Sequence, residues 1–425
     1  MKKTICVLFI LVFAISTKAQ NINGSISSSV YSFERYDDLN NSDKYFRTFQ
    51  SLYLNVNKSN FSLRTRLNLE ADIANKLDND PRLRFYNLYF EARKIFDIAT
   101  IKLGRQPLYN VVAGGIFDGA SVDVKTSKFT IGGFYGGNVP AYQKLELIDN
   151  WSDNYILGGK FTYLPVENLK VGLYYIDKNF KPQDYEALRL DADNNPITVL
   201  IQQKSNQYRY ASADISYIQE KEFSAYSRVD FDFNAFKPSK FELSGRYEKI
   251  ENLGLSLYYN YRLPYVRYNS IFAVFDYGNT QEIELGGDYR INNIFTIVGK
   301  VANVMYKDEN SQRITMGINS GYGSISYRKN MGYSGEMDAF SIYGAYSFWE
   351  GLLTPSLGFG YTGYKLSANS PQYNISTFMG GVNYRPIKTL SFDVQTQYFN
   401  NKIYKNDFRV FLKVNYWFNT NLNII

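Results

Sequence analysis

Histidine is absent from this chain of 425 residues, and cysteine occurs once, at Cys6. The lack of histidine excludes Ser-His-Asp and Cys-His nucleophilic sites and metal sites built on imidazole ligands. Pairs of carboxylates can still catalyse hydrolysis, but Asp and Glu are scattered along alternating segments, which favours solvated faces over a catalytic centre. We therefore expect no enzyme and no catalytic, cofactor-binding or metal-binding residue.

Long hydrophobic runs are also absent, apart from one at the N-terminus. Lys2 and Lys3 precede an apolar core at 5–15, and Thr17 and Ala19 are the small residues expected before a cleavage point. This core is too short to cross a bilayer, so it predicts a secretory signal peptide over residues 1–19, with a mature chain from Gln20. An uncleaved membrane anchor is the less favoured alternative. With Cys6 in the leader, we expect no disulfide in the exported chain.

The net charge is small once the predicted leader is set aside. The full chain has 47 Lys and Arg against 40 Asp and Glu, and loss of Lys2, Lys3 and Lys18 would leave 44 basic residues. This excess is too weak and too dispersed for nucleic-acid binding, which needs clustered basic residues. The 39 Tyr and 31 Phe are the stronger signal, because tyrosine, with an apolar ring and a polar tip, suits a membrane interface.

Strict alternation of apolar and polar residues recurs along the chain. In 61–71, FSLRTRLNLEA, the odd positions are apolar or Thr and the even positions are polar or charged, as in a β-strand with two different faces. The same pattern occurs at 241–248, 253–263, 390–398 and 408–418. Segments of about ten residues are long enough to cross a membrane at a tilt, and no helical stripe follows the leader.

Two kinds of connection separate these segments. Similar tight turns occur in 163–175, 247–259 and 384–394, with Pro165 and Pro386 where a strand ends. Longer polar connections are expected at 36–44, 72–82, 137–153 and 178–205, and we assign 268–277 to a loop as well. Short turns on one rim and long loops on the other are typical of outer-membrane barrels. The segment 178–205 is either an extracellular loop or an inward-folding constriction.

Size decides which face of each strand is inside. A single soluble sandwich rarely needs about 405 residues, and no linker divides the chain. We therefore predict one domain over 20–425, an all-β, single antiparallel transmembrane β-barrel. Counting candidate strands gives about 22, the weakest around 311–330, and such a barrel is too wide for side chains to fill. Its charged face should line a wet lumen, with Arg64, Arg66, Arg246 and Arg262 as pore-lining residues.

A short motif adds a family resemblance. Gly-Arg-Gln at 104–106 and Phe-Asp-Gly at 117–119 bracket one loop, and this pair resembles the alginate-export-like family of outer-membrane barrels. The resemblance implies about 18 strands, within a range of about 16 to 22, and an arginine-rich channel for an acidic polysaccharide. It also implies pore-lining roles for Arg105, Gln106 and Asp118. Arg105 is then expected at the channel constriction, or, alternatively, paired with Asp118 only to anchor the loop.

The sequence thus predicts an outer-membrane channel of the Gram-negative envelope for passive diffusion or export of polar solutes, including anionic ones such as acidic saccharides. Arginine suits such a lumen because its planar fork binds carboxylates and phosphates. The expected partners are outer-membrane lipid and small polar or anionic solutes or polysaccharide, with no nucleic acid. The alternative is a structural or adhesive surface barrel with a plugged lumen and extracellular loops that bind a partner.

Overall fold

The structure is a computed structural model that describes residues 20–36, 42–76, 80–109, 112–140, 145–181, 184–191, 193–201, 207–264, 278–306, 309–332, 337–365, 369–400 and 407–422. The predicted leader 1–19 and the segment 268–277 lie outside the described residues.

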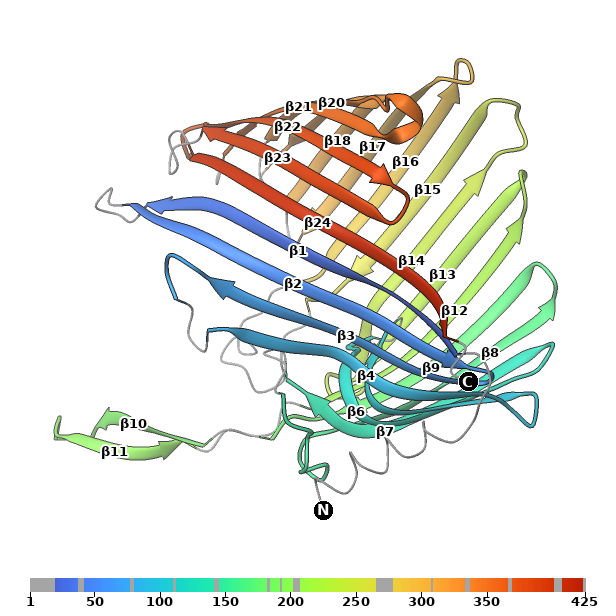
Figure 1. Cartoon of the computed structure of the whole chain (residues 1–425), viewed down its shortest axis with the longest axis vertical. Helices are drawn as coiled ribbons and strands as arrows, with labels where there is room; N and C mark the ends of the chain where they lie inside the picture. The colour runs from blue at the N-terminus through green and yellow to red at the C-terminus, as the bar shows by residue number, and fades with distance from the viewer. Residues whose placement is uncertain are drawn as a thin grey trace.

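Twenty-two strands form one antiparallel sheet that closes on itself, because the last strand, β24, pairs with the first, β1. Figure 1 shows this barrel with β1 and β24 side by side. A separate two-stranded sheet is formed by β10 and β11. The strands are β1 Gln20–Tyr36, β2 Ser42–Lys58, β3 Phe61–Asp72, β4 Arg82–Ile95, β5 Ala99–Leu108, β6 Gly115–Lys125, β7 Phe129–Val139, β8 Tyr155–Val166, β9 Leu169–Lys178, β10 Tyr185–Leu190, β11 Pro196–Ile201, β12 Tyr208–Gln219, β13 Phe223–Asp232, β14 Lys237–Tyr247, β15 Leu253–Arg262, β16 Thr280–Arg290, β17 Phe295–Tyr306, β18 Glu309–Ser320, β19 Gly323–Met331, β20 Met337–Ala345, β21 Leu353–Tyr364, β22 Tyr373–Ile387, β23 Leu390–Asn400 and β24 Asp407–Leu422.

The all-β, closed antiparallel barrel predicted from the alternation is confirmed. The central estimate of about 18 strands, which came from the family resemblance, is too low; the 22 strands observed are at the upper limit of the expected range. The region around 311–330, which gave a weak pattern, contains two full strands, β18 and β19. They are held in register by β17 and β20 on either side, so their own sequence need not specify the pairing.

Along each strand, one series of alternate side chains is mainly polar and the other is mainly apolar. The polar series faces the inside of the barrel. On β16, Ile283 and Leu285 are 42% and 55% exposed, and they alternate with Glu282 and Glu284. Side chains on a concave face converge, and those of the polar series do meet across an intervening strand: Arg313 of β18 contacts both glutamates. The apolar series therefore lies on the convex outer face, as a barrel in lipid requires.

Two rims differ in their connections. All the hairpins at one rim are short, namely 59–60, 96–98, 126–128, 167–168, 220–222, 248–252, 291–294, 321–322, 346–352 and 388–389. At the other rim the strand ends are further apart in sequence, as between Val139 of β7 and Tyr155 of β8 or between Lys178 of β9 and Tyr208 of β12. Pro165 and Pro386 lie where the ladders β8–β9 and β22–β23 shift register, so their missing N–H groups cost no regular ladder bond.

One wall of the barrel carries a small apolar cluster on its inner face. Phe117, Ile156, Ile176 and Tyr210 occupy the inner series of β6, β8, β9 and β12, and Val112 packs against them. Lys178 holds the residues next to Val112, because its Nζ donates a hydrogen bond to the carbonyl oxygen of Gly114 over 3.0 Å. Residues 112–114, which precede β6, therefore lie on the inner side of the barrel wall.

Helix is nearly absent from the described residues. It is limited to the 3₁₀ turn Trp349–Gly351 between β20 and β21. No helix in these ranges is long and apolar enough to cross a membrane.

Candidate functional site on the inner wall

The inner wall from β14 to β18 carries two groups of ion pairs. In the first, Arg246 of β14 makes a bidentate pair with Asp288 of β16, with Nη1–Oδ1 at 2.8 Å and Nη2–Oδ2 at 3.1 Å. Its Nε also donates to Glu248, over 2.7 Å. The guanidinium reaches Asp288 across β15 because Gly254 lies between them: a Cβ there would be 2.3 Å from Arg246 Nη2.

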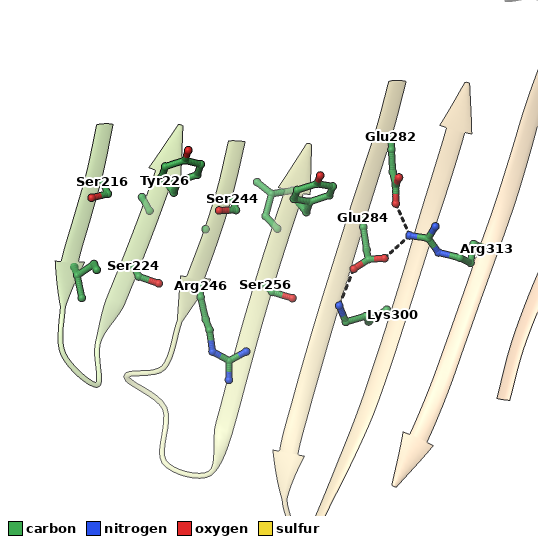
Figure 2. Close-up of a pocket in the computed structure, with 15 residues that line it drawn as sticks. Ser216, Ser224, Tyr226, Ser244, Arg246, Ser256, Glu282, Glu284, Lys300 and Arg313 are labelled. Carbon is green, nitrogen blue, oxygen red and sulfur yellow. Dashed lines mark hydrogen bonds and ion pairs between the residues drawn. The ribbon is translucent and has the colours of Figure 1, made fainter. Parts of the chain in front are cut away.

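The second group joins β16, β17 and β18. Lys300 Nζ is 2.8 Å from Glu284 Oε1, and Arg313 Nη2 is 2.6 Å from Glu284 Oε2. Arg313 also contacts Glu282. Figure 2 shows the four side chains meeting on one wall of the barrel, with Arg246 a few strands away. Every cation of the two groups is thus paired with a carboxylate.

Between and beside these groups lies a recess of about 730 Å³. The strand registers arrange its lining in two parallel rows across the wall. One row alternates serine and tyrosine, as Ser216, Tyr226, Ser244 and Tyr258, on β12 to β15. The neighbouring row contains Ser224, Arg246 and Ser256, on β13 to β15, and Gly286 of β16 follows Ser256 in register beside the recess.

Arg64 and Arg66, both expected to line the pore, lie on the inner series of β3, opposite Asn55 and Tyr53 of β2. Arg64 Nη2 is 3.1 Å from Glu91 Oε1 on β4. Arg66 is more exposed and lies over the ring of Tyr86, with Cζ 5.5 Å from the ring centroid. The structure therefore brings these two arginines to one wall, separated from the β14–β18 groups by the width of the barrel (Figure 1).

Arg262 lies on the inner series at the end of β15, opposite Lys240 of β14 and Thr280 of β16. It is exposed and lies near the rim with the longer connections. Arg246, by contrast, lies toward the rim with the short hairpins. Arg246 and Arg262, which were both predicted to line the pore, therefore lie at different depths of the barrel.

Arg105 and Asp118 form a pair, but on a different face from the one expected. Their register places them in the series of Leu103, Ala120 and Tyr135, which is the outer face. Arg105 Nε and Nη2 are 2.7 Å and 2.8 Å from the two oxygens of Asp118, and both residues are 3% exposed. The constriction role assigned to Arg105 does not fit this placement.

The segment 145–154 covers this pair from outside. Arg105 Nη2 donates to the carbonyl oxygen of Glu146 over 2.9 Å, and the backbone N–H of Ile148 donates to Asp118 over 3.0 Å. A Cβ at Gly137, next to Asp118 in register, would be 2.5 Å from the Ile148 side chain, so only glycine leaves room for the segment. Trp151 completes the cover against Tyr135.

Gln106 lies on the inner series beside Phe117 and is 3% exposed. Its Nε2 donates to the Gly119 carbonyl oxygen over 3.1 Å, and its Oε1 accepts from Ser121 over 2.7 Å. Its polar atoms are thus used to join β5 and β6. Gly104 and Gly119 pair directly between these strands, and each is confined from its other side. A Cβ at Gly104 would be 2.4 Å from the Leu88 carbonyl oxygen of β4, and one at Gly119 would be 2.2 Å from the Tyr135 carbonyl oxygen of β7.

The serines and tyrosines of the recess were not predicted as site residues. Each belongs to an alternating strand, so the sequence places it on the inner face, but only the registers show that they form adjacent rows. Among the described residues, no group of three or more Asp, Glu or Cys side chains is arranged to hold a metal ion.

No family model matches the chain, and no curated protein matches its sequence. The resemblance to the alginate-export-like family therefore stays a prediction. Similar solved structures include the P pilus usher (PapC) translocation pore, at 10% identity and a TM-score of 0.46, covering 94% of this chain and 99% of that one. A BenF-like porin from Pseudomonas fluorescens Pf-5 has 10% identity and a TM-score of 0.44, with the same coverage. OpdK of Pseudomonas aeruginosa, solved with vanillate, has 10% identity and a TM-score of 0.42 over 95% and 99% of the chains. Likeness at this level assigns no function to this chain.

Proposed function

We propose that this protein is an outer-membrane channel for the passive passage of polar solutes, exported by a signal peptide at 1–19. The observation that carries the proposal is the opposite character of the two barrel faces. Exposed apolar side chains predominate on the outside, and polar and charged side chains line most of the inside. Closure leaves no unpaired strand edge, which is the condition for a β-structure to cross lipid.

The inner wall is suited to hydrated solutes. A barrel with 22 strands is wider than its side chains can fill. Four inner cations, Arg64, Arg246, Lys300 and Arg313, are held against carboxylates of the same wall. Residues 112–114 narrow one side of the interior next to Lys178. Arg64, Arg66, Arg246 and Arg262 are proposed as lining residues. Gln106, expected to line the pore, is instead proposed as a buried link between β5 and β6, and Arg105 and Asp118 as the anchor of an outer covering segment.

The direct test is reconstitution of the purified, folded protein into planar lipid bilayers. We expect stepwise ion conductance and, in swelling assays, entry of small sugars into liposomes. Folding is checked independently by strand-dominated circular dichroism and by a changed gel mobility without heating. A folded barrel that conducts no ions in these bilayers would contradict the channel.

A surface-adhesion barrel is a second candidate because of the hairpin β10–β11. Figure 1 shows this hairpin apart from the barrel, and Leu188 and Leu200 are 72% and 55% exposed. Between its two strands, Asp191 accepts from the backbone N–H groups of Asn195 and Asp193, and these bonds hold the pKa of its carboxyl below the usual value.

Deletion of 184–201 separates the two candidates. A channel should keep its conductance without this hairpin, whereas an adhesive barrel should lose binding of cells to an abiotic or cellular surface. Retained adhesion together with lost conductance would contradict both assignments.

A further inference from the structure

The recess on the inner wall of β12–β16 offers hydroxyl groups and aromatic rings rather than free charge. We propose that it is a binding subsite for a neutral, polyhydroxylated solute, namely an oligosaccharide without carboxylates. The inference rests on the proposed channel, because a passing solute meets this wall from the lumen. It names the class of solute that the wall selects.

The charges at the recess are already satisfied within the wall. Arg246 uses Nε, Nη1 and Nη2 on Glu248 and Asp288. Lys300 and Arg313 are paired with Glu282 and Glu284. Three cations thus face four carboxylates. An anionic solute would have to displace a carboxylate from a formed, charge-assisted pair, whereas a neutral one would not.

The hydroxyl groups, in contrast, are available. Among the described residues, no hydrogen bond occupies the side chains of Ser216, Ser224, Ser244 and Ser256. Each hydroxyl can both donate and accept, as a sugar hydroxyl does. Figure 2 shows these serines on neighbouring strands of one wall, with Tyr226 and Arg246 among them.

Two tyrosines supply the apolar part of the site. Tyr226 on β13 and Tyr258 on β15 lie in the same row, with Ser244 between them. Neighbouring strands are spaced by about 4.8 Å, so the backbones that carry the two tyrosines are about 10 Å apart, a separation at which each ring can contact a different ring of one oligosaccharide. A tyrosine offers an apolar face together with a polar tip, which matches the apolar face and polar edge of a pyranose.

Gly286 lies beside the recess, between Ser256 and Lys300, which both line it. A Cβ at Gly286 would be 2.5 Å from Ser256 Oγ and 3.2 Å from the Lys300 side chain. A larger residue there would displace the hydroxyl into the space that the solute needs, and it would push Lys300 away from Glu284. The small residues Ser216, Ser224, Ser244, Ser256 and Gly286 thus account for the hollow between the bulky ones.

The test is block of single-channel current by maltohexaose, with a six-residue oligomannuronate as the charged comparison. We expect concentration-dependent block by the neutral sugar and at least tenfold weaker block by the uronate. The double variant Tyr226→Ala/Tyr258→Ala should weaken maltohexaose block at least tenfold, and the matched Phe variants should retain most of it. Tyr53→Ala, on the inner face of β2, is the control. Maltohexaose should block the current through this variant as strongly as it blocks the current through the parent protein.

A second variant tests whether the paired charges exclude anionic solutes. Glu284→Gln releases Lys300 and part of Arg313, so block by the uronate should increase several-fold while block by maltohexaose changes little. A uronate that blocks the parent more strongly than maltohexaose would overturn the neutral assignment. Conductance without any maltohexaose block would overturn the subsite and leave the channel standing. Binding of maltohexaose to the protein in detergent, without conductance in bilayers, would contradict the channel and leave the subsite standing.

Discussion

Two bidentate arginine–carboxylate pairs, Arg105–Asp118 and Arg246–Asp288, have nearly the same hydrogen-bond lengths and opposite surroundings. The side chains of the first pair are 3% and 4% exposed, and those of the second are 37% and 27% exposed. The first lies on the outer face beneath the segment 145–154; the second lies on the inner wall. The same chemical pair can therefore anchor a loop or line a lumen, and the face of the strand decides which.

The largest effect is expected for the buried pair. Arg105→Ala leaves Asp118 without its partner in a site closed to water, which should cost about 3–5 kcal/mol of the free energy of unfolding. The segment 145–154 should also become accessible to protease, because Glu146 loses its donor. Urea unfolding in detergent and limited proteolysis measure the two effects.

The exposed pair is the matched control for that experiment. Arg246→Ala should cost about 1 kcal/mol or less, because pairs in contact with water contribute little. Equal losses of stability in the two variants would mean that Arg105 and Arg246 are equally solvated, and the contrast between the faces would be wrong.

A second contrast lies between adjacent residues of β3. Leu67→Arg should cost about 2–4 kcal/mol if the side chain faces the middle of the bilayer, since the outer face then carries a charge in lipid. Arg66→Leu, on the inner face, should leave folding nearly unchanged. Both are measured by unfolding in lipid vesicles. Failure of Arg66→Leu to assemble would show that the inner face of β3 is not in water.

The alternation in the sequence, together with the length of the chain, was enough to predict the fold class and the faces of β3, β15 and β23. It also contained the signal for Arg105, because Ile101, Leu103 and Arg105 share one parity while Lys102, Gly104 and Gln106 share the other. Gly104 and the resemblance of the motif to a known family instead favoured a role for Arg105 in the lumen. What the strand alone could not show is that the segment 145–154, distant in sequence, covers the outer face and makes a buried charge pair possible there.

The contacts between side chains beside the recess could not be predicted either, because they depend on how neighbouring strands are paired. Arg246 and Asp288 meet across β15 only because three strands are in register and Gly254 leaves the path open. A shift of one residue between β15 and β16 would move Asp288 to the other face. Alternation gives the face of each residue, and the registers of neighbouring strands give its partners.

The smallest predicted effect concerns ion selectivity. Arg246→Gln leaves Asp288 and Glu248 without their cation, so the reversal potential in a salt gradient should shift toward cation selectivity. Asp288→Asn, which frees part of the positive charge of Arg246, should shift it the other way. The two variants change the same pair by one charge of opposite sign, and neither alters the outer face.

Salt dependence then shows whether these charges are in the water-filled lumen. The Debye length falls from about 10 Å at 0.1 M salt to about 3 Å at 1 M, so both shifts should be clear at the lower concentration and largely lost at the higher one. Arg105→Gln should produce no shift at either concentration, because that arginine faces outward beneath its covering segment. A shift with Arg105→Gln as large as that with Arg246→Gln would return Arg105 to the lumen and contradict the assignment of the two pairs to opposite faces.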